Sequence, residues 1–381
     1  MNTLQEQTHT FNFPTRVRFG KGVSNELGPH LYERGFRSPL IVTDPGLATL
    51  PMFAAIIDQL KKTGMTVAVF ANIQKNPVKS DVIKGEMQYK NHHCDCIIGL
   101  GGGASMDVAR AIALKINHEK DLFDYMEAVG GELLITNEIP YFVTVPTTSG
   151  TGSEVGRSTV ISDDITHQKK IIFHPSLLAR IVFADPVLTM DLPPAITAAT
   201  GMDALTHNIE AFLAKGFHPL CDGIALEGIR LINESLEGAV KYPTLANRTN
   251  MMAGALMGAV AFQKGLGLIH SMAHALSTHK DLHHGLANAL MMPTGLRFNM
   301  RSVRHKIKRI ESHLGIQQPL ADYTRALTMR IGLPVTLASQ GISMSDVDAL
   351  AKLAFADGCH QCNEVNVTEN DFKTLFTEAL Q

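Results

Sequence analysis

The first half of the chain alternates short apolar runs with amphipathic stretches, and this alternation constrains the fold more than any other feature. The apolar runs, which are typical of buried strands, lie at residues 40–43, 66–70, 96–100, 141–145 and 181–183. Segments with helical periodicity lie between several of these runs, at residues 52–63 and 81–89. Because strands covered on both faces are apolar throughout, the pattern predicts a parallel sheet with helices packed on it.

The strand pattern stops after the sequence Asp191-Leu192-Pro193-Pro194. Apolar residues then recur at helical spacing, at Ala225, Ile229, Ile232, Leu236 and Val240. We therefore predict an α/β domain with a parallel sheet over residues 1–190 and an all-α domain over residues 191–381. A cleft between two such domains is where a ligand is expected to bind.

Charge and cysteine content narrow the possible partners and location. Lys and Arg number 34 against 36 Asp and Glu, so the net charge of -2 offers no basic excess for nucleic acid or an anionic membrane. The most apolar run, residues 251–262, is too short to span a bilayer, and its Gly254 and Gly258 predict a buried helix in close packing. Five cysteines and a polar N-terminus without a signal segment indicate a reduced, cytoplasmic protein with no nucleic-acid or membrane partner.

Two loops rich in small residues follow predicted strands. The first, Gly99 to Ala104, opens a predicted helix over residues 106–116 and satisfies the G-x-G-x-x-[G/A] dinucleotide pattern, although a tight turn would have the same sequence. The second, Pro146 to Glu154, can hold a pyrophosphate or ribose through amides and hydroxyls, or it is a flexible surface loop. Their joint presence favours a bound nucleotide.

Asp44 stands at the end of the first clear strand. There it could accept hydrogen bonds from an adenosine ribose and repel a 2′-phosphate, which would favour NAD over NADP. The alternative is an ordinary turn aspartate before Pro45-Gly46.

Acidic and histidine residues recur at one-turn spacing in the second half. Asp203 and His207 are four residues apart on a predicted helix, so both point to one face, and His270 lies in an apolar, glycine-containing stretch. One carboxylate and several imidazoles indicate a site for a divalent metal with a position open for substrate. Spacing alone leaves open which later histidines take part: His274, His279, His283 or His284.

Over nearly its whole length the chain resembles the iron-dependent (group III) alcohol dehydrogenases. The motifs that carry the resemblance are Phe19-Gly20-Lys21-Gly22, the segment Gly101 to Asp107, the segment Pro146 to Glu154, Gly201-Met202-Asp203-Ala204-Leu205-Thr206-His207, and the segment Gly267 to Gly285. Together they are highly specific. The resemblance implies a dinucleotide-binding α/β domain, an all-α metal-binding domain and a homodimer.

The resemblance also implies site residues and a reaction. The metal ligands fall on Asp203, His207, His270 and His284. His274 falls on a second histidine near the metal, either a proton relay or a hydrogen-bonding neighbour. Cofactor contacts fall on Asp44, Asn76, Gly101, Gly102, Gly103, Ser105, Asp107, Thr147, Thr148, Thr151 and Lys169. The implied reaction is reversible hydride transfer between NAD and a small primary alcohol or aldehyde, with Fe2+ as the first choice of metal and Zn2+ as the second.

Two departures from the family pattern bear on the substrate. Lys264 stands where a small or apolar residue is expected, and Asn363-Glu364-Val365 replaces the more usual Asn-Pro-Arg. An anionic substrate would explain Lys264. So would a lyase resembling dehydroquinate synthase, which uses NAD transiently on a sugar phosphate. A non-catalytic protein that binds metal or nucleotide is the third interpretation.

Overall fold

The computed structural model describes residues 15–381, which form two compact units. One comprises residues 15–148 and 152–191 and is called the α/β unit; the other comprises residues 149–151 and 192–381 and is called the helical unit. The predicted fold class, a parallel α/β region followed by a helical one, is confirmed.

The α/β unit is built on a six-stranded sheet in the order β1-β8-β5-β4-β2-β3, with every neighbouring pair parallel. Its strands are β1 (Arg16–Phe19), β2 (Pro39–Val42), β3 (Ala68–Phe70), β4 (Cys96–Gly101), β5 (Phe142–Pro146) and β8 (Ile181–Ala184). Each of the five predicted apolar runs overlaps one of these strands. In the β4–β5 pair Gly101 lies opposite Pro146, so the two small-residue loops leave the sheet side by side.

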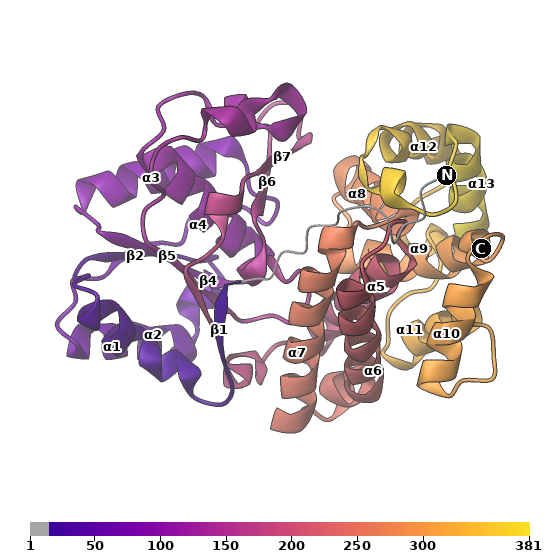
Figure 1. Ribbon diagram of the computed structural model, residues 1–381, viewed down its shortest axis with the longest axis horizontal. Helices are drawn as coiled ribbons and strands as arrows, with labels where there is room; N and C mark the ends of the chain where they lie inside the picture. The colour runs from indigo at the N-terminus through magenta and orange to yellow at the C-terminus, as the bar shows by residue number, and fades with distance from the viewer. Residues whose placement is uncertain (1–14) are drawn as a thin grey trace. The chain divides into compact units, whose positions relative to one another are not determined.

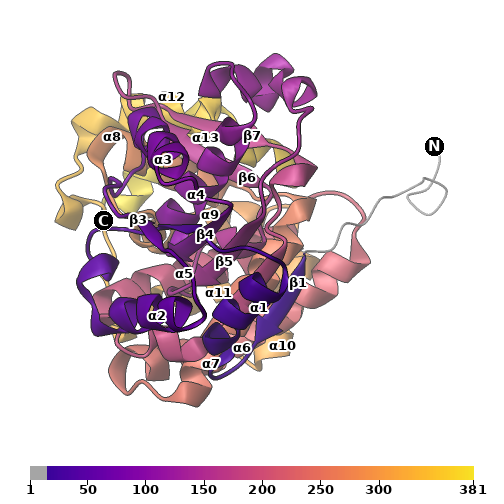
Figure 2. The same cartoon turned by 90° about the vertical axis from the view of Figure 1, so that its left-hand side faces the viewer.

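Helices cover both faces of this sheet, as the views in Figures 1 and 2 agree. Their bounds are α1 (Leu27–Glu33), α2 (Pro51–Lys62), α3 (Lys79–Asn91) and α4 (Gly103–Ile116). The helices α1 and α2 share one apolar cluster with Ile98 of β4, whereas α3 and α4 share another with Ile97. Successive residues of a strand point to opposite faces of the sheet. Because helices cover both faces, residues on both must be apolar, and the strands form uninterrupted apolar runs.

Three strands were missed by the sequence prediction. The edge strand β1 is mostly exposed and carries arginines at alternate positions, so it has no apolar run. The other two form a separate antiparallel hairpin, β6 (Ser158–Ser162) and β7 (Lys169–Phe173).

The helical unit is organised around α5, whose residues 201–213 are all buried. Its helices are α5 (Pro194–Leu213), α6 (Pro219–Lys241), α7 (Leu245–Ala261), α8 (Leu268–Lys280), α9 (His284–Asn299), α10 (Arg304–Leu314), α11 (Leu320–Arg330), α12 (Val347–Ala356) and α13 (Glu369–Ala379). The predicted close packing of α7 is confirmed, because a Cβ on Gly254 would lie 2.5 Å from Ile232 and one on Gly258 would lie 2.6 Å from Asn208.

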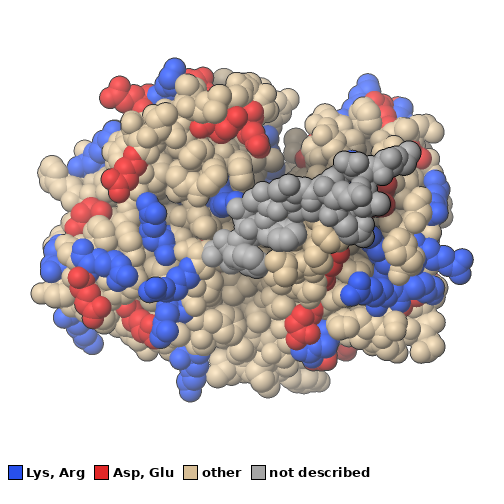
Figure 3. Space-filling model, in the orientation of Figure 1, with Lys and Arg blue, Asp and Glu red and all other residues tan. Residues whose placement is uncertain are grey.

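Among residues 15–381 no single helix has both the length and the apolar composition to cross a bilayer; one bent pair, with an angle of 107°, meets both criteria when its halves are taken together. On the face seen in Figure 3, basic and acidic side chains are interspersed and form no extended basic patch.

Candidate metal and coenzyme sites

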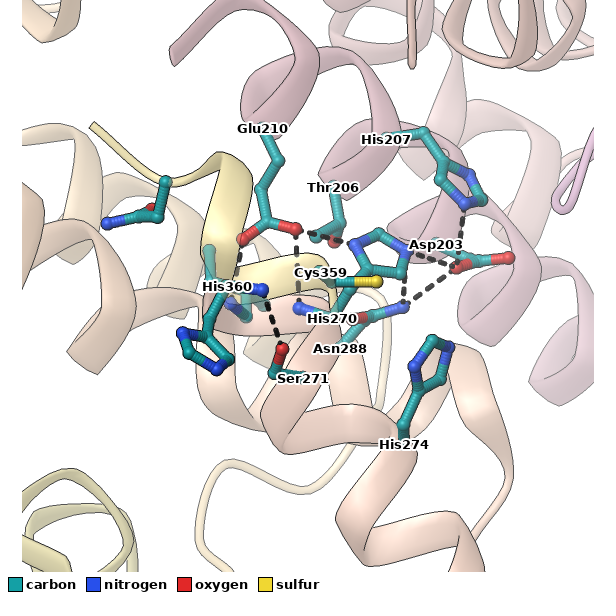
Figure 4. Close-up of polar contacts among 12 residues, drawn as sticks. Asp203, Thr206, His207, Glu210, His270, Ser271, His274, Asn288, Cys359 and His360 are labelled. Atoms are coloured by element: carbon teal, nitrogen blue, oxygen red, sulfur yellow. Dashed lines mark hydrogen bonds and ion pairs between the residues drawn. The ribbon is translucent and has the colours of Figure 1, made fainter. Parts of the chain in front are cut away.

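Three side chains from three helices converge in the helical unit, and Figure 4 shows two of them, Asp203 and His270. Asp203 comes from α5, His270 from α8 and His284 from α9, and their ligand atoms all lie within 4.8 Å of one another. The Asp203 Oδ1 atom is 3.3 Å from His284 Nε2 and 3.8 Å from His270 Nε2. One carboxylate oxygen and two imidazole nitrogens at this spacing suit a divalent transition metal.

The remaining predicted metal ligand, His207, lies beside this group. Its Nε2 atom is 3.9 Å from Asp203 Oδ1, and its ring stacks on that of His270 with centroids 4.6 Å apart. His274 is also near, with its ring stacked on that of His284 at 5.2 Å and its Nδ1 atom 2.8 Å from Asp357 Oδ2.

The protonation states of Asp203, His207 and His284 fit a cation, whereas His270 must lose a proton to bind one. Burial lowers the pKa of His207 to about 4 and that of His284 to about 3, so both imidazoles are neutral at pH 7 and offer lone pairs. Burial disfavours ionisation of Asp203, but the surrounding His207, His284 and His270 hold the pKa of its carboxyl well below the ordinary value. Burial also lowers the pKa of His270, but hydrogen bonds to Asp203 and Glu210 outweigh this effect and raise the pKa to about 9, so this imidazole carries a proton at pH 7 that a metal would displace.

Spacing alone did not decide which later histidines join the metal site. In the structure, two of the four candidates, His279 and His283, lie outside the group formed by Asp203, His270 and His284. The Nε2 atom of His279 lies 2.9 Å from Asp346 Oδ1, on the side of α8 that faces the 3-10 turn Met344–Asp346. His283 is the residue before α9 and is outside the group of three ligand atoms.

Sequence reasoning missed three residues of the site. The buried Asn288 donates from Nδ2 to Asp203 Oδ1 at 2.8 Å and lies 3.2 Å from His284 Nε2, while its own Oδ1 has no hydrogen-bond partner within residues 15–381. Glu210 and Asp357 contact His270 and His274 respectively. Helical spacing could have found the first two, because Asn288 follows His284 by four residues and Glu210 follows His207 by three.

The first small-residue loop begins α4. Gly102 is the N-cap residue and Gly103 the first residue of the helix, so free backbone N–H groups face the end of the sheet. Gly101 has a φ of +143°, and a Cβ there would lie 2.6 Å from Ser105 Oγ, so glycine is required. Asp44 lies next to this loop: its Oδ1 accepts from Leu47 N at 2.8 Å, and its Oδ2 would be 3.6 Å from that Cβ.

The other predicted cofactor residues divide into three groups. Thr147 donates its backbone N–H to Gly101 O at 3.0 Å, which ties the second loop to the first, and Thr148 lies close to Gly102. Thr151 lies in the short segment Ser149–Thr151, which belongs to the helical unit. The remaining three are Asn76, which precedes the bridge between Val78 and Ser162; Lys169, which pairs with Ser162; and the buried Ser105.

Asp107 has its carboxylate oxygens engaged within the α/β unit. Its Oδ1 accepts from Ser153 Oγ at 2.6 Å and Arg110 Nη1 at 3.0 Å, and its Oδ2 accepts from Val160 N at 3.1 Å. These bonds hold the second loop and β6 against α4.

Glu154, at the end of the second loop, should make the stability of the fold depend on pH. Its buried carboxyl has a pKa raised to about 7 by desolvation, since Arg110 gives its hydrogen bonds to other groups. The folded protein therefore holds a proton that the unfolded chain, with a pKa of about 4.5, releases. Stability from this group is full below pH 4.5 and is lost as the pH rises through 7.

We expect Glu154→Gln to unfold at the same temperature as the wild type near pH 4 and at a higher temperature at pH 8.5. At pH 8.5 the free energies of unfolding of the two proteins should differ by roughly 3 kcal/mol at most. Thermal unfolding of both proteins across this pH range checks it. A difference that does not vary with pH would contradict the assignment.

Lys264 and Glu364, which depart from the family pattern, both lie near the C-terminal end of α5. The Lys264 side chain is 2 % exposed, and its Nζ atom lies 2.5 Å from Asp222 Oδ1 and 3.2 Å from Phe212 O. Lys306 Nζ donates to Ala214 O at 3.0 Å and lies 3.3 Å from Glu364 Oε2. Because Lys264 is paired and buried, it contributes to helix packing and supports neither a phosphate-gripping lyase nor an anionic substrate.

Comparisons with known proteins identify the family. Residues 14–186 match the family model described as iron-containing alcohol dehydrogenase, and residues 197–380 match that described as Fe-containing alcohol dehydrogenase family, C-terminal. The 4-hydroxybutyrate dehydrogenase of Cupriavidus necator is 37% identical over 379 residues, which covers 96% of this chain and 98% of that protein.

Solved structures show the same similarity. A crystal structure of 1,3-propanediol oxidoreductase has a TM-score of 0.92 and 32% identity, and the match covers 97% of this chain and 100% of that one. Sulfoacetaldehyde reductase from Bifidobacterium kashiwanohense, in complex with NAD+, has a TM-score of 0.89 and 25% identity, with 98% and 99% covered. The chain belongs to the iron-containing alcohol dehydrogenase family.

Proposed function

We propose that this dehydrogenase oxidises a small primary alcohol with NAD, and reduces the corresponding aldehyde with NADH, on substrates that include alcohols with an anionic end group. The observation that carries the proposal is the convergence of Asp203, His270 and His284 within 4.8 Å. Similarity along the whole chain to a 4-hydroxybutyrate dehydrogenase supports the anionic substrates. These similarities favour the dehydrogenase over the lyase and the binding-protein interpretations.

The proposed metal ligands are Asp203, His207, His270 and His284, with iron as the first choice and zinc as the second. When bound, the metal supplies a Lewis acid that favours loss of the alcohol proton, and NAD accepts the hydride. The protein holds the ligand atoms in place through buried helices and keeps the Asp203 carboxylate ionised. We propose that the glycine loop at the start of α4 holds the NAD pyrophosphate.

The decisive experiment is NADH formation followed at 340 nm. Protein stripped of metal would be compared with protein reloaded anaerobically with Fe(II), each mixed with NAD and a panel of short alcohols, diols and hydroxy acids. NADH only in the reloaded sample supports the proposal and ranks substrates. Bound metal without NADH from any alcohol would favour the lyase or the binding-only protein.

We propose His274 as the residue that takes up the alcohol proton and passes it to solvent. Its side chain is 24 % exposed, and its Nδ1 atom lies 2.8 Å from the Asp357 carboxylate, so Nε2 is the nitrogen able to accept a proton. We expect His274→Ala to lower kcat by at least about 100-fold while metal content stays near that of the wild type. Turnover and elemental analysis test this; loss of the metal in the variant would refute the relay.

Asp44 is the proposed reader of the adenosine ribose. Loss of its carboxylate in Asp44→Gly should narrow the preference for NAD over NADP on the order of 10- to 100-fold, as measured by the ratio of kcat/KM values. Asp44→Asn is a matched variant, because an amide oxygen can still accept from Leu47 N. An Asn variant with wild-type preference would assign Asp44 to the turn alone.

We also propose that the protein is cytoplasmic and assembles as a homodimer. All five cysteines lie within the described residues and are free, which fits a reducing cytoplasm. A homodimer is proposed from the family, and light scattering on the purified protein tests it.

A further inference from the structure

Glu210 links the two helices that carry three of the proposed metal ligands. It lies on α5, seven residues after Asp203, and is 2 % exposed. Its Oε1 accepts from Ile269 N at 2.7 Å, and its Oε2 lies 3.2 Å from His270 N and 2.6 Å from His270 Nδ1 (Figure 4). One carboxylate therefore meets three nitrogen atoms at the start of α8.

These contacts determine which nitrogen of His270 carries hydrogen. An ionised carboxylate only accepts hydrogen bonds, so the two backbone N–H groups and Nδ1 must all donate. The backbone groups belong to the first turn of α8, where N–H groups have no partner within the helix and a negative charge is favoured. With a hydrogen held on Nδ1 by Glu210, the Nε2 atom, which faces Asp203, is the nitrogen that must give up its hydrogen when a metal binds.

We infer that Glu210 is a positioning residue of the metal site, which holds His270 in the Nδ1–H tautomer and orients its Nε2 atom for the metal. The inference rests on the proposed function, because it assumes that His270 is a ligand. A carboxylate behind a ligating histidine also makes the imidazole a stronger donor.

Gly267 gives independent support. A Cβ at this residue would lie 2.7 Å from Glu210 Oε1 and 2.8 Å from Asn363 Oδ1, so only glycine leaves room for the carboxylate to reach the helix. Its φ of -145° is one that alanine tolerates. Gly267→Ala would therefore displace the Glu210 carboxylate while leaving every proposed ligand in the chain.

The test measures metal affinity in the stripped full-length protein with Zn(II) alone, by competition with a chelator. In Glu210→Gln the side chain has one acceptor oxygen for three donors, so its NH2 group must face a donor. We expect the affinity to fall roughly 10- to 100-fold. The matched control is Glu311→Gln, a buried carboxylate of the same unit that accepts from Leu320 N at 2.9 Å, and its affinity should not change.

A second readout separates positioning from support of the fold. In the Zn(II)-loaded wild type labelled with 15N-histidine, the His270 ring should give an Nδ1–H signal, and this signal should weaken or shift in Glu210→Gln. If that variant does not fold, Gly267→Ala is measured instead, with the same loss expected. Wild-type affinity and an unchanged signal would overturn the inference. Failure of the wild type itself to bind Fe(II) or Zn(II) would instead overturn the proposed function.

Discussion

Replacing His270 with alanine should remove the bound metal and abolish NADH formation together. The imidazole lies between Asp203 and Glu210 in a fully buried setting, so no other side chain can take its place without rearrangement of α5 and α8. We expect metal affinity to fall by more than the roughly 10- to 100-fold that is caused by loss of a residue hydrogen-bonded to a ligand. Elemental analysis and the 340 nm assay measure the two effects.

His279 provides the matched control, because it lies on the same helix. Its spacing made it a candidate ligand, but in the structure its Nε2 atom lies 2.9 Å from Asp346 Oδ1. His279→Ala should therefore keep both metal and turnover. Full activity in His270→Ala, or metal loss in both variants, would contradict the ligand assignment.

Gly285→Ala adds one methyl group near the metal site and should strongly reduce both stability and metal binding. A Cβ at this residue would lie 2.1 Å from the backbone oxygen of Ala199 and 3.3 Å from the Cβ of Asp203. A backbone atom cannot rotate away, so α9 must move from α5, and His284 moves with it. We expect a loss of about 3 kcal/mol or more in the free energy of unfolding, together with weaker metal binding.

Gly223→Ala is the control for this variant. It lies on α6 of the same unit, and among the described residues a Cβ there would have no neighbour within 4 Å. Alanine should leave metal binding unchanged and stabilise the helix by up to about 1 kcal/mol. Chemical unfolding and Zn(II) titration of both variants measure these effects; equal stability of the two would show that the helices can separate without strain.

The sheet was predictable where both of its faces are covered. In β4, Ile97 and Ile98 enter different apolar clusters, and the resulting apolar run is visible in the sequence. In β1, Arg16 and Arg18 lie at an exposed edge, where no such run is needed. Strand pairing at an edge is decided by the neighbouring strand, which local sequence does not reveal.

The metal cluster was predictable only in part, for a related reason. The spacing of Asp203 and His207 places them on one helical face, which is a local property. Whether His279 or His284 completes the cluster depends on how α8 and α9 cross, and that is decided by packing. Asp357 could not be found at all from spacing, since it comes from a turn 83 residues beyond its partner His274.

The complete burial of residues 201–213 limits how this enzyme can be altered. Nearly every replacement on that stretch changes core volume or the ligand geometry, so random libraries that include it will return mostly unfolded or metal-free protein. A change of substrate range is therefore best sought at residues outside this helix, with its ligand-bearing turns left unchanged.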